Sequence, residues 1–120
     1  MTMKSLLVSD IFFVISIVTG VILWAIALYV KNNQPQKPNR SYGYRTSRSM
    51  RTQEAWDFSQ EYSINLLIKS AQFLCLLAVL SLFIELNKEL SGYLATIVIL
   101  LVVLFPVYKT ERELKKRFGT

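Results

Sequence analysis

The strongest constraint on the fold is a stretch of 20 residues, 11–30, that contains no charged side chain. An α-helix of that length rises about 30 Å, which is the thickness of the hydrocarbon core of a bilayer. Two further apolar stretches follow at residues 66–84 and 90–108, and only Lys69 brings a charge into them. The sequence therefore predicts an all-α integral membrane protein, a single membrane domain of residues 1–120, with three transmembrane helices.

The first stretch has a second interpretation as a cleaved signal peptide, because Ala25-Ile26-Ala27 resembles a cleavage site. The stretch is longer than the apolar part of most signal peptides, and the stronger positive charge follows it. Trp24 and Tyr29 lie toward its polar end, where the aromatic belt of a membrane helix is expected. These features favour a span that is retained.

Basic residues are divided unequally between the two sides of the predicted membrane. One lies before the first stretch (Lys4) and one in the linker of residues 85–89 (Lys88), whereas six lie between the first two stretches and five follow the third. Basic loops stay in the cytoplasm under the positive-inside rule. We therefore predict a multi-pass protein of the cell membrane, with its N-terminus outside and its first connection and C-terminus in the cytoplasm.

The third stretch has distinct features at its two ends. The linker before it is short, so the third helix is expected to return antiparallel beside the second. Pro106 lies in its last turn, where proline is expected to loosen or end a helix. Residues 109–120 carry five basic and two acidic side chains. They are expected to form an interfacial tail that contacts anionic headgroups of the lipid bilayer.

The chain offers few groups for catalysis. It contains no histidine, and its one cysteine, Cys75, lies within an apolar stretch. This composition excludes an intrachain disulfide, a Cys/His zinc site and a serine–histidine catalytic site. We expect no enzyme activity, no metal and no cofactor. The net charge of +6 is also found in nucleic acid binders. Here the basic residues flank the apolar stretches and indicate membrane topology, so no direct nucleic acid partner is expected.

Residues 41–60 form the only long polar segment between apolar stretches, and arginines alternate with aromatic side chains in it. Gly43 permits backbone angles that a side chain forbids. Thr52 can cap a helix that begins after it, and Glu54 and Asp57 lie in or near the first turn of that helix, where negative charge is favourable. This segment, the signature segment below, is the predicted working surface.

Arg45, Trp56 and Gln60 are the most informative set within the signature segment. Trp56 and Gln60 are four residues apart and therefore share one face of the predicted helix. A turn at Gly43 is expected to bring Arg45 to this face, where it would stack on Trp56 or pair with Glu54. The pattern fits either a structural clasp or a recognition pocket for a peptide, a headgroup or a cytosolic partner.

The signature segment resembles the signature of the SdpI/YfhL family, small bacterial membrane proteins of which one gives immunity to a secreted killing peptide. The matching residues are Gly43-Tyr44-Arg45-Thr46, Ser49-Met50, Glu54-Ala55-Trp56 and Gln60. With the flanking apolar stretches, the resemblance covers about residues 30–108. It implies an immunity or signalling protein that binds or neutralises a membrane-active peptide toxin and recruits a cytosolic repressor-type regulator.

The resemblance also implies which side chains form the binding surface. They are Gly43, Tyr44, Arg45, Thr46, Ser49, Glu54, Trp56 and Gln60. Many relatives are expected to carry His or Asn where this chain carries Gln60. An amide does not titrate near neutral pH, so no proton-linked role is expected at this position.

An alternative function is that of a small oligomeric transporter or ion-conducting protein, with Lys69, Glu54 and Glu61 along a path between chains. Lys69 lies within about one turn of the polar end of its stretch. Its amine can therefore snorkel to the headgroups, or it can be buried for a function inside the membrane. Small residues spaced three or four apart in each stretch also make a homo-oligomer plausible. These are Ser16 and Gly20, then Ala71, Cys75 and Ala78, then Gly92 and Thr96.

Overall fold

The computed structural model describes residues 11–85 and 87–119, and these residues form three α-helices and no strand. The helices are α2 (Ile11–Asn32), α3 (Gln53–Ser81) and α4 (Lys88–Phe118). Each is long and apolar enough to cross a membrane. The predicted all-α fold with three spans is therefore confirmed. The N-terminal lead, on which part of the predicted topology rests, lies outside the described residues.

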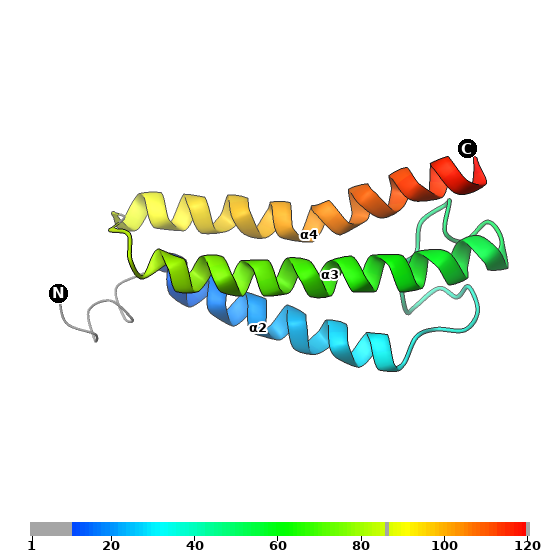
Figure 1. Ribbon diagram of the computed structural model, residues 1–120, viewed down its shortest axis with the longest axis horizontal. Helices are drawn as coiled ribbons and strands as arrows, with labels where there is room; N and C mark the ends of the chain where they lie inside the picture. The colour runs from blue at the N-terminus through cyan, green and yellow to red at the C-terminus, as the bar shows by residue number, and fades with distance from the viewer. Residues whose placement is uncertain (1–10, 86, 120) are drawn as a thin grey trace.

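The three helices run antiparallel to their chain neighbours, and α3 lies between α2 and α4 in the view of Figure 1. The connection from α2 to α3 and the C-terminal part of α4 meet at one end of the bundle, here called the loop end. The two most basic parts of the sequence therefore lie at the same end, as the charge distribution requires. Which side of the membrane the loop end faces stays a prediction.

Small residues let α2 and α3 approach closely. A Cβ added to Gly20 would lie 2.7 Å from Cys75 Sγ and 3.4 Å from the backbone oxygen of Ala71. Ser16 and Ala78, from the same two small-residue sets, are fully buried. Within the chain, these sets pack the α2–α3 interface, as small residues do in membrane helices. Apolar side chains cover the outside of the bundle instead, as expected for a lipid-facing surface.

The second span ends earlier than predicted, at Ser81 rather than residue 84. Leu82, Phe83 and Ile84 each donate a backbone hydrogen bond to the residue three positions before, so the chain turns there. The third helix also begins earlier than predicted, at Lys88. The side chain of Asn87 accepts a hydrogen bond from Leu90 N at 2.8 Å and so caps the helix.

Pro106 was expected to loosen or end the third helix, and it does not end it, because α4 continues to Phe118. Proline removes one helical hydrogen bond, and Figure 1 shows the axis of α4 changing direction near the middle of the helix. Beyond the proline, side-chain contacts with α3 stabilise the helix. The Arg117 guanidinium carbon lies 4.5 Å from the ring centre of Phe58 on α3, and the Phe118 ring meets the same ring edge-on. The 31 residues of α4 extend about 46 Å, well beyond a hydrocarbon core of about 30 Å.

Candidate functional site

The start of α3 is built as predicted. Thr52 has an extended backbone, and its Oγ1 accepts a hydrogen bond from Ala55 N at 3.0 Å. This cap fixes the first turn, which places Trp56 and Gln60 one turn apart on the same face. Both side chains are buried against the connection from α2, with Trp56 at 0% exposure and Gln60 at 4%.

The side chain of Gln60 pairs with the backbone of Tyr44 through two hydrogen bonds. Tyr44 N donates to Gln60 Oε1 at 2.7 Å, and Gln60 Nε2 donates to Tyr44 O at 2.7 Å. The amide therefore satisfies both polar groups of one residue, as a neighbouring strand would. An amide is well suited to this contact because it carries a donor and an acceptor side by side.

Gly43 makes this pairing possible. Its φ of +101° lies in a region that side chains rarely adopt. A Cβ at this position would lie 2.6 Å from both Gln60 Oε1 and Pro35 Cγ. The predicted turn at Gly43 is confirmed, and its partner on α3 is Gln60.

Trp56 closes the other side of this contact. Its Nε1 donates a hydrogen bond to Pro35 O at 2.9 Å. The indole thus fixes the segment that leaves α2, while Gln60 fixes the segment that approaches α3. We use the name clasp for the five residues Pro35, Gly43, Tyr44, Trp56 and Gln60.

Thr46 and Ser49 form a tight turn next to the clasp. Thr46 N donates to Ser49 Oγ at 2.8 Å, and Ser49 N donates to Thr46 Oγ1 at 3.1 Å. Ser49 is fully buried, and its hydroxyl lies 3.1 Å from the carbonyl oxygens of both Tyr44 and Thr46. Both signature residues therefore order the loop, and the Ser49 hydroxyl is buried rather than presented to solvent as a ligand.

Glu111 of α4 also belongs to the site, although no motif in the sequence selects it. Its Oε1 accepts a hydrogen bond from the Tyr44 hydroxyl at 2.9 Å, and its Oε2 forms an ion pair with Arg48 Nη1 at 3.1 Å. The carboxylate therefore ties the signature segment to the part of α4 beyond Pro106. In the sequence Glu111 differs from the basic residues around it only in its negative charge, and Glu113 shares that property.

The surroundings of Glu111 hold its carboxylate in the charged form. Burial alone would raise the pKa of Glu111, but hydrogen bonds with Thr46, Tyr44 and Arg48, together with the Arg48 charge, outweigh burial and lower it. Burial and the hydrogen bond to Glu111 raise the pKa of Tyr44 far above its usual value. Tyr44 thus remains a neutral donor to an ionised acceptor.

Acidification is expected to weaken the contact between the loop and α4. A carboxyl whose pKa is lowered by folding contributes stability above its unfolded pKa of about 4.3, and this is lost as the pH falls through the folded pKa. Thermal unfolding in detergent between pH 7 and pH 3 tests this. We expect Glu111→Gln to melt a few degrees below wild type at pH 7, and the two proteins to converge in acid. Coincident curves would show that the Glu111 side chain contributes nothing, and a constant offset would show that its contribution does not depend on its charge.

The predicted partners of Arg45 are wrong. Its side chain is exposed, and its Nη1 donates to the carbonyl oxygen of Arg40 rather than meeting Trp56 or Glu54. Trp56 is covered by the loop itself, so its ring offers no face to a guanidinium. Glu54 is exposed and lines a small hollow of about 130 Å³ with Arg48. Arg45 and Glu54 therefore lie outside the clasp.

A polar cluster marks the boundary between the loop and the apolar part of the bundle. Lys31 Nζ donates to Asn65 Oδ1 at 2.8 Å, and Gln34 Nε2 donates to Glu61 Oε2 at 2.6 Å. Hydrogen bonds with Gln34 and Asn65 lower the pKa of Glu61. Glu61 therefore serves a hydrogen-bonded contact between α3 and the connection that follows α2, on an exposed surface.

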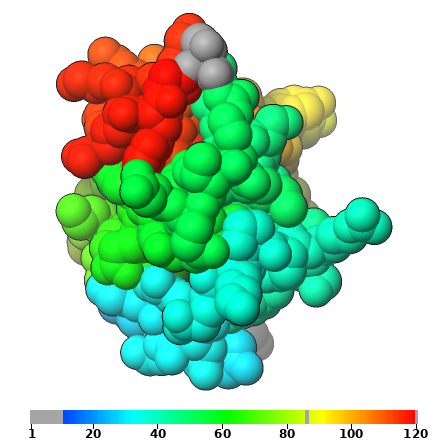
Figure 2. Space-filling view, turned by 90° about the vertical axis from the view of Figure 1, so that its right-hand side faces the viewer, coloured from blue at the N-terminus to red at the C-terminus, as the bar shows by residue number. Residues whose placement is uncertain are grey.

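A pocket of about 390 Å³ lies beneath the loop and opens among all three helices. On its loop side are Gly43, Tyr44 and Gln60, and on its helix sides are apolar residues such as Leu23 and Val103. We call this cavity the clasp pocket. Figure 2 looks at the loop end, where the connection (cyan to green) covers the bundle between the end of α2 and the last turns of α4 (red). The pocket thus joins polar loop groups to the apolar interior.

Comparison with known proteins gives one family. A model of the SdpI/YfhL protein family matches residues 36–109, which include the whole signature segment and the apolar parts of α3 and α4. No curated protein and no solved structure matches the chain.

Proposed function

Since this chain belongs to the SdpI/YfhL protein family, we propose that it protects a cell by binding a membrane-active peptide toxin in the clasp pocket. Membership in this family points to a membrane protein of the immunity type. The toxin as ligand and the pocket as its site are our proposal. The bound peptide would be held at the level where the bilayer meets water.

The composition of the clasp pocket is the observation that supports this proposal best. Three signature residues, Gly43, Tyr44 and Gln60, line one side, and apolar side chains from α2, α3 and α4 line the others. A membrane-active peptide presents an apolar face together with polar groups. The pocket offers a matching surface to each, and its volume of about 390 Å³ suits the insertion of one or two side chains rather than a whole helix.

Filling the pocket without disturbing the clasp tests the proposal. Val103 lines the pocket and is 40% exposed, whereas its neighbour Leu104 is 57% exposed and lies outside the pocket. In a sensitive strain challenged with a panel of membrane-active peptides, we expect Val103→Trp to reduce survival to that of cells without the protein. Leu104→Trp adds the same bulk to the lipid-facing side and is expected to protect as well as wild type.

Membrane levels of both variants, measured by blot, show whether each protein is present. Protection by Val103→Trp equal to that of wild type would place the ligand outside the clasp pocket. Failure of wild type to protect against any peptide of the panel would refute the toxin as ligand.

A further inference from the structure

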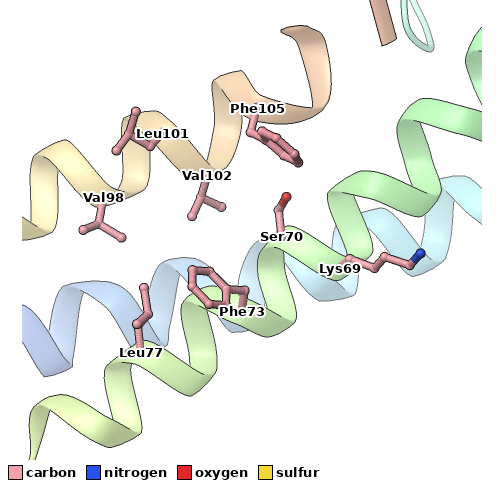
Figure 3. Close-up of a pocket in the computed structure, with 8 residues that line it drawn as sticks. All are labelled: Lys69, Ser70, Phe73, Leu77, Val98, Leu101, Val102 and Phe105. Carbon is pink, nitrogen blue, oxygen red and sulfur yellow. The ribbon is translucent and has the colours of Figure 1, made fainter. Parts of the chain in front are cut away.

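A second groove lies between α3 and α4, nearer the middle of the bundle, and shares no lining residue with the clasp pocket. Its volume is about 470 Å³, within the range of small-molecule sites. Phe73 and Leu77 of α3 face Val98 and Val102 of α4 across it (Figure 3). These walls are apolar, so the groove suits a hydrocarbon chain.

The two polar residues that line the groove, Lys69 and Ser70, both lie at its end nearer the loop. From Lys69 to Leu77 is a rise of about 12 Å along the helix. One leaflet of a bilayer has a hydrocarbon depth of about 15 Å, half of the full core. The groove is thus about as long as one leaflet is deep. Like a lipid molecule, it has polar groups at one end and apolar groups along the rest.

Lys69 carries an uncompensated charge. It is exposed, and its amine makes neither an ion pair nor a hydrogen bond with any described residue. Figure 3 shows the side chain running along α3 toward the loop end. The polar cluster at Asn65 and Lys31 lies one turn further in that direction. The amine therefore snorkels to the headgroup level of the leaflet that the groove faces.

Ser70 supplies a second polar group with no partner. The residue is only 9% exposed, and its hydroxyl points from α3 into the space between the helices (Figure 3). Serine in a helix often bonds the carbonyl one turn before, but this hydroxyl makes no hydrogen bond with a described residue. A donor is thus left free just below the level of the Lys69 amine, at the depth of a lipid ester carbonyl.

We propose that the groove is a binding site for an anionic phospholipid of the leaflet on the loop side. Lys69 contacts the phosphate, Ser70 donates to an ester carbonyl, and one acyl chain lies between Phe73 and Leu101. A transmembrane helix from a second chain would fit less well, because it would place apolar surface at the charged end of the groove.

Lipid retention by the purified full-length protein tests this site. The protein in detergent micelles is given equal amounts of phosphatidylglycerol and phosphatidylcholine with matched chains, and bound lipid is counted by native mass spectrometry. We expect wild type to retain more phosphatidylglycerol than phosphatidylcholine. In Lys69→Ala the ratio of the two bound lipids is expected to fall about fivefold, which is the effect of removing one charge at the interface. Lys88→Ala removes the same charge from an exposed position at the start of α4, outside the groove and outside the basic tail, and it is expected to keep the preference.

A second pair of variants tests the acyl chain. Leu101 lines the groove and is 63% exposed, and Leu100 beside it is 55% exposed and does not line it. Leu101→Trp is expected to reduce retention of both lipids by filling the groove, and Leu100→Trp to leave it unchanged.

Three results would overturn the proposal. The first is an unchanged preference in Lys69→Ala. The second is an equal loss in Lys88→Ala, since the preference would then come from positive charge in general rather than from the groove. The third is a dimer that is lost in Leu101→Trp while lipid retention persists, which would assign the groove to a second copy of the chain.

Discussion

Replacing Trp56 by alanine is expected to detach the loop from α3 and to lower the free energy of unfolding by about 3–5 kcal/mol, the usual loss for a large aromatic core residue. The indole is fully buried and donates to Pro35 O at 2.9 Å. Its removal leaves a cavity at the centre of the clasp and a backbone carbonyl without its donor. The loop contains four arginines, Arg40, Arg45, Arg48 and Arg51, so limited trypsin digestion of membranes reports its release directly.

Trp56→Phe is the milder control, because it keeps one aromatic ring while losing the N–H group and the second ring of the indole. We expect it to cost about 1–3 kcal/mol, for the lost hydrogen bond and a small cavity, and to keep the loop resistant to trypsin. Loss of toxin protection in Trp56→Ala then reports a disrupted clasp rather than a lost contact with the toxin. Resistance of Trp56→Ala to trypsin equal to that of wild type would contradict the structural role of the indole.

Replacing Gly43 by alanine is expected to be nearly as damaging, although only one methyl group is added. The positive φ costs about 1–2 kcal/mol for a residue with a Cβ, and the methyl group would lie 2.6 Å from Gln60 Oε1. Gln60 must then move and release Tyr44, at a cost of about 0.5–1.5 kcal/mol for each of two hydrogen bonds. The expected total is about 2–5 kcal/mol, measured by thermal unfolding in detergent.

Gly92 provides the control for this substitution. It lies in α4, and a Cβ there would meet nothing within 4 Å. Alanine has the better helix propensity, so Gly92→Ala is expected to leave stability unchanged or to raise it by up to about 1 kcal/mol. If Gly43→Ala unfolds at the same temperature as wild type, the pairing of Gln60 with Tyr44 does not depend on the glycine.

The parts of this structure that could be predicted are those set by local sequence. Apolar stretches of bilayer length predict the three helices, Thr52 marks the start of α3, and the four-residue spacing of Trp56 and Gln60 puts them on one buried face. Gly43 indicates the turn. In each case the physical cause lies within a few residues of the effect.

Partners that are distant or belong to the backbone could not be predicted. The acceptor for Trp56 is the carbonyl of Pro35, and every residue carries such a group. Glu111 became a partner only because α4 continues past Pro106, a residue that was expected to loosen or end the helix. Arg45 was assigned to an aromatic partner by type, but its long side chain reaches a backbone oxygen on its own side of the loop.

The separation of these contacts along the chain sets an order of assembly. The bonds from Gln60 to Tyr44 and from Trp56 to Pro35 span 16 and 21 residues, so α2, the loop and the start of α3 suffice to make them. The bond from Tyr44 to Glu111 spans 67 residues and must wait until α4 has been inserted. Short loops close sooner than long ones. During synthesis the clasp can therefore form on two helices, and the contact with α4 completes it only when the third is in place.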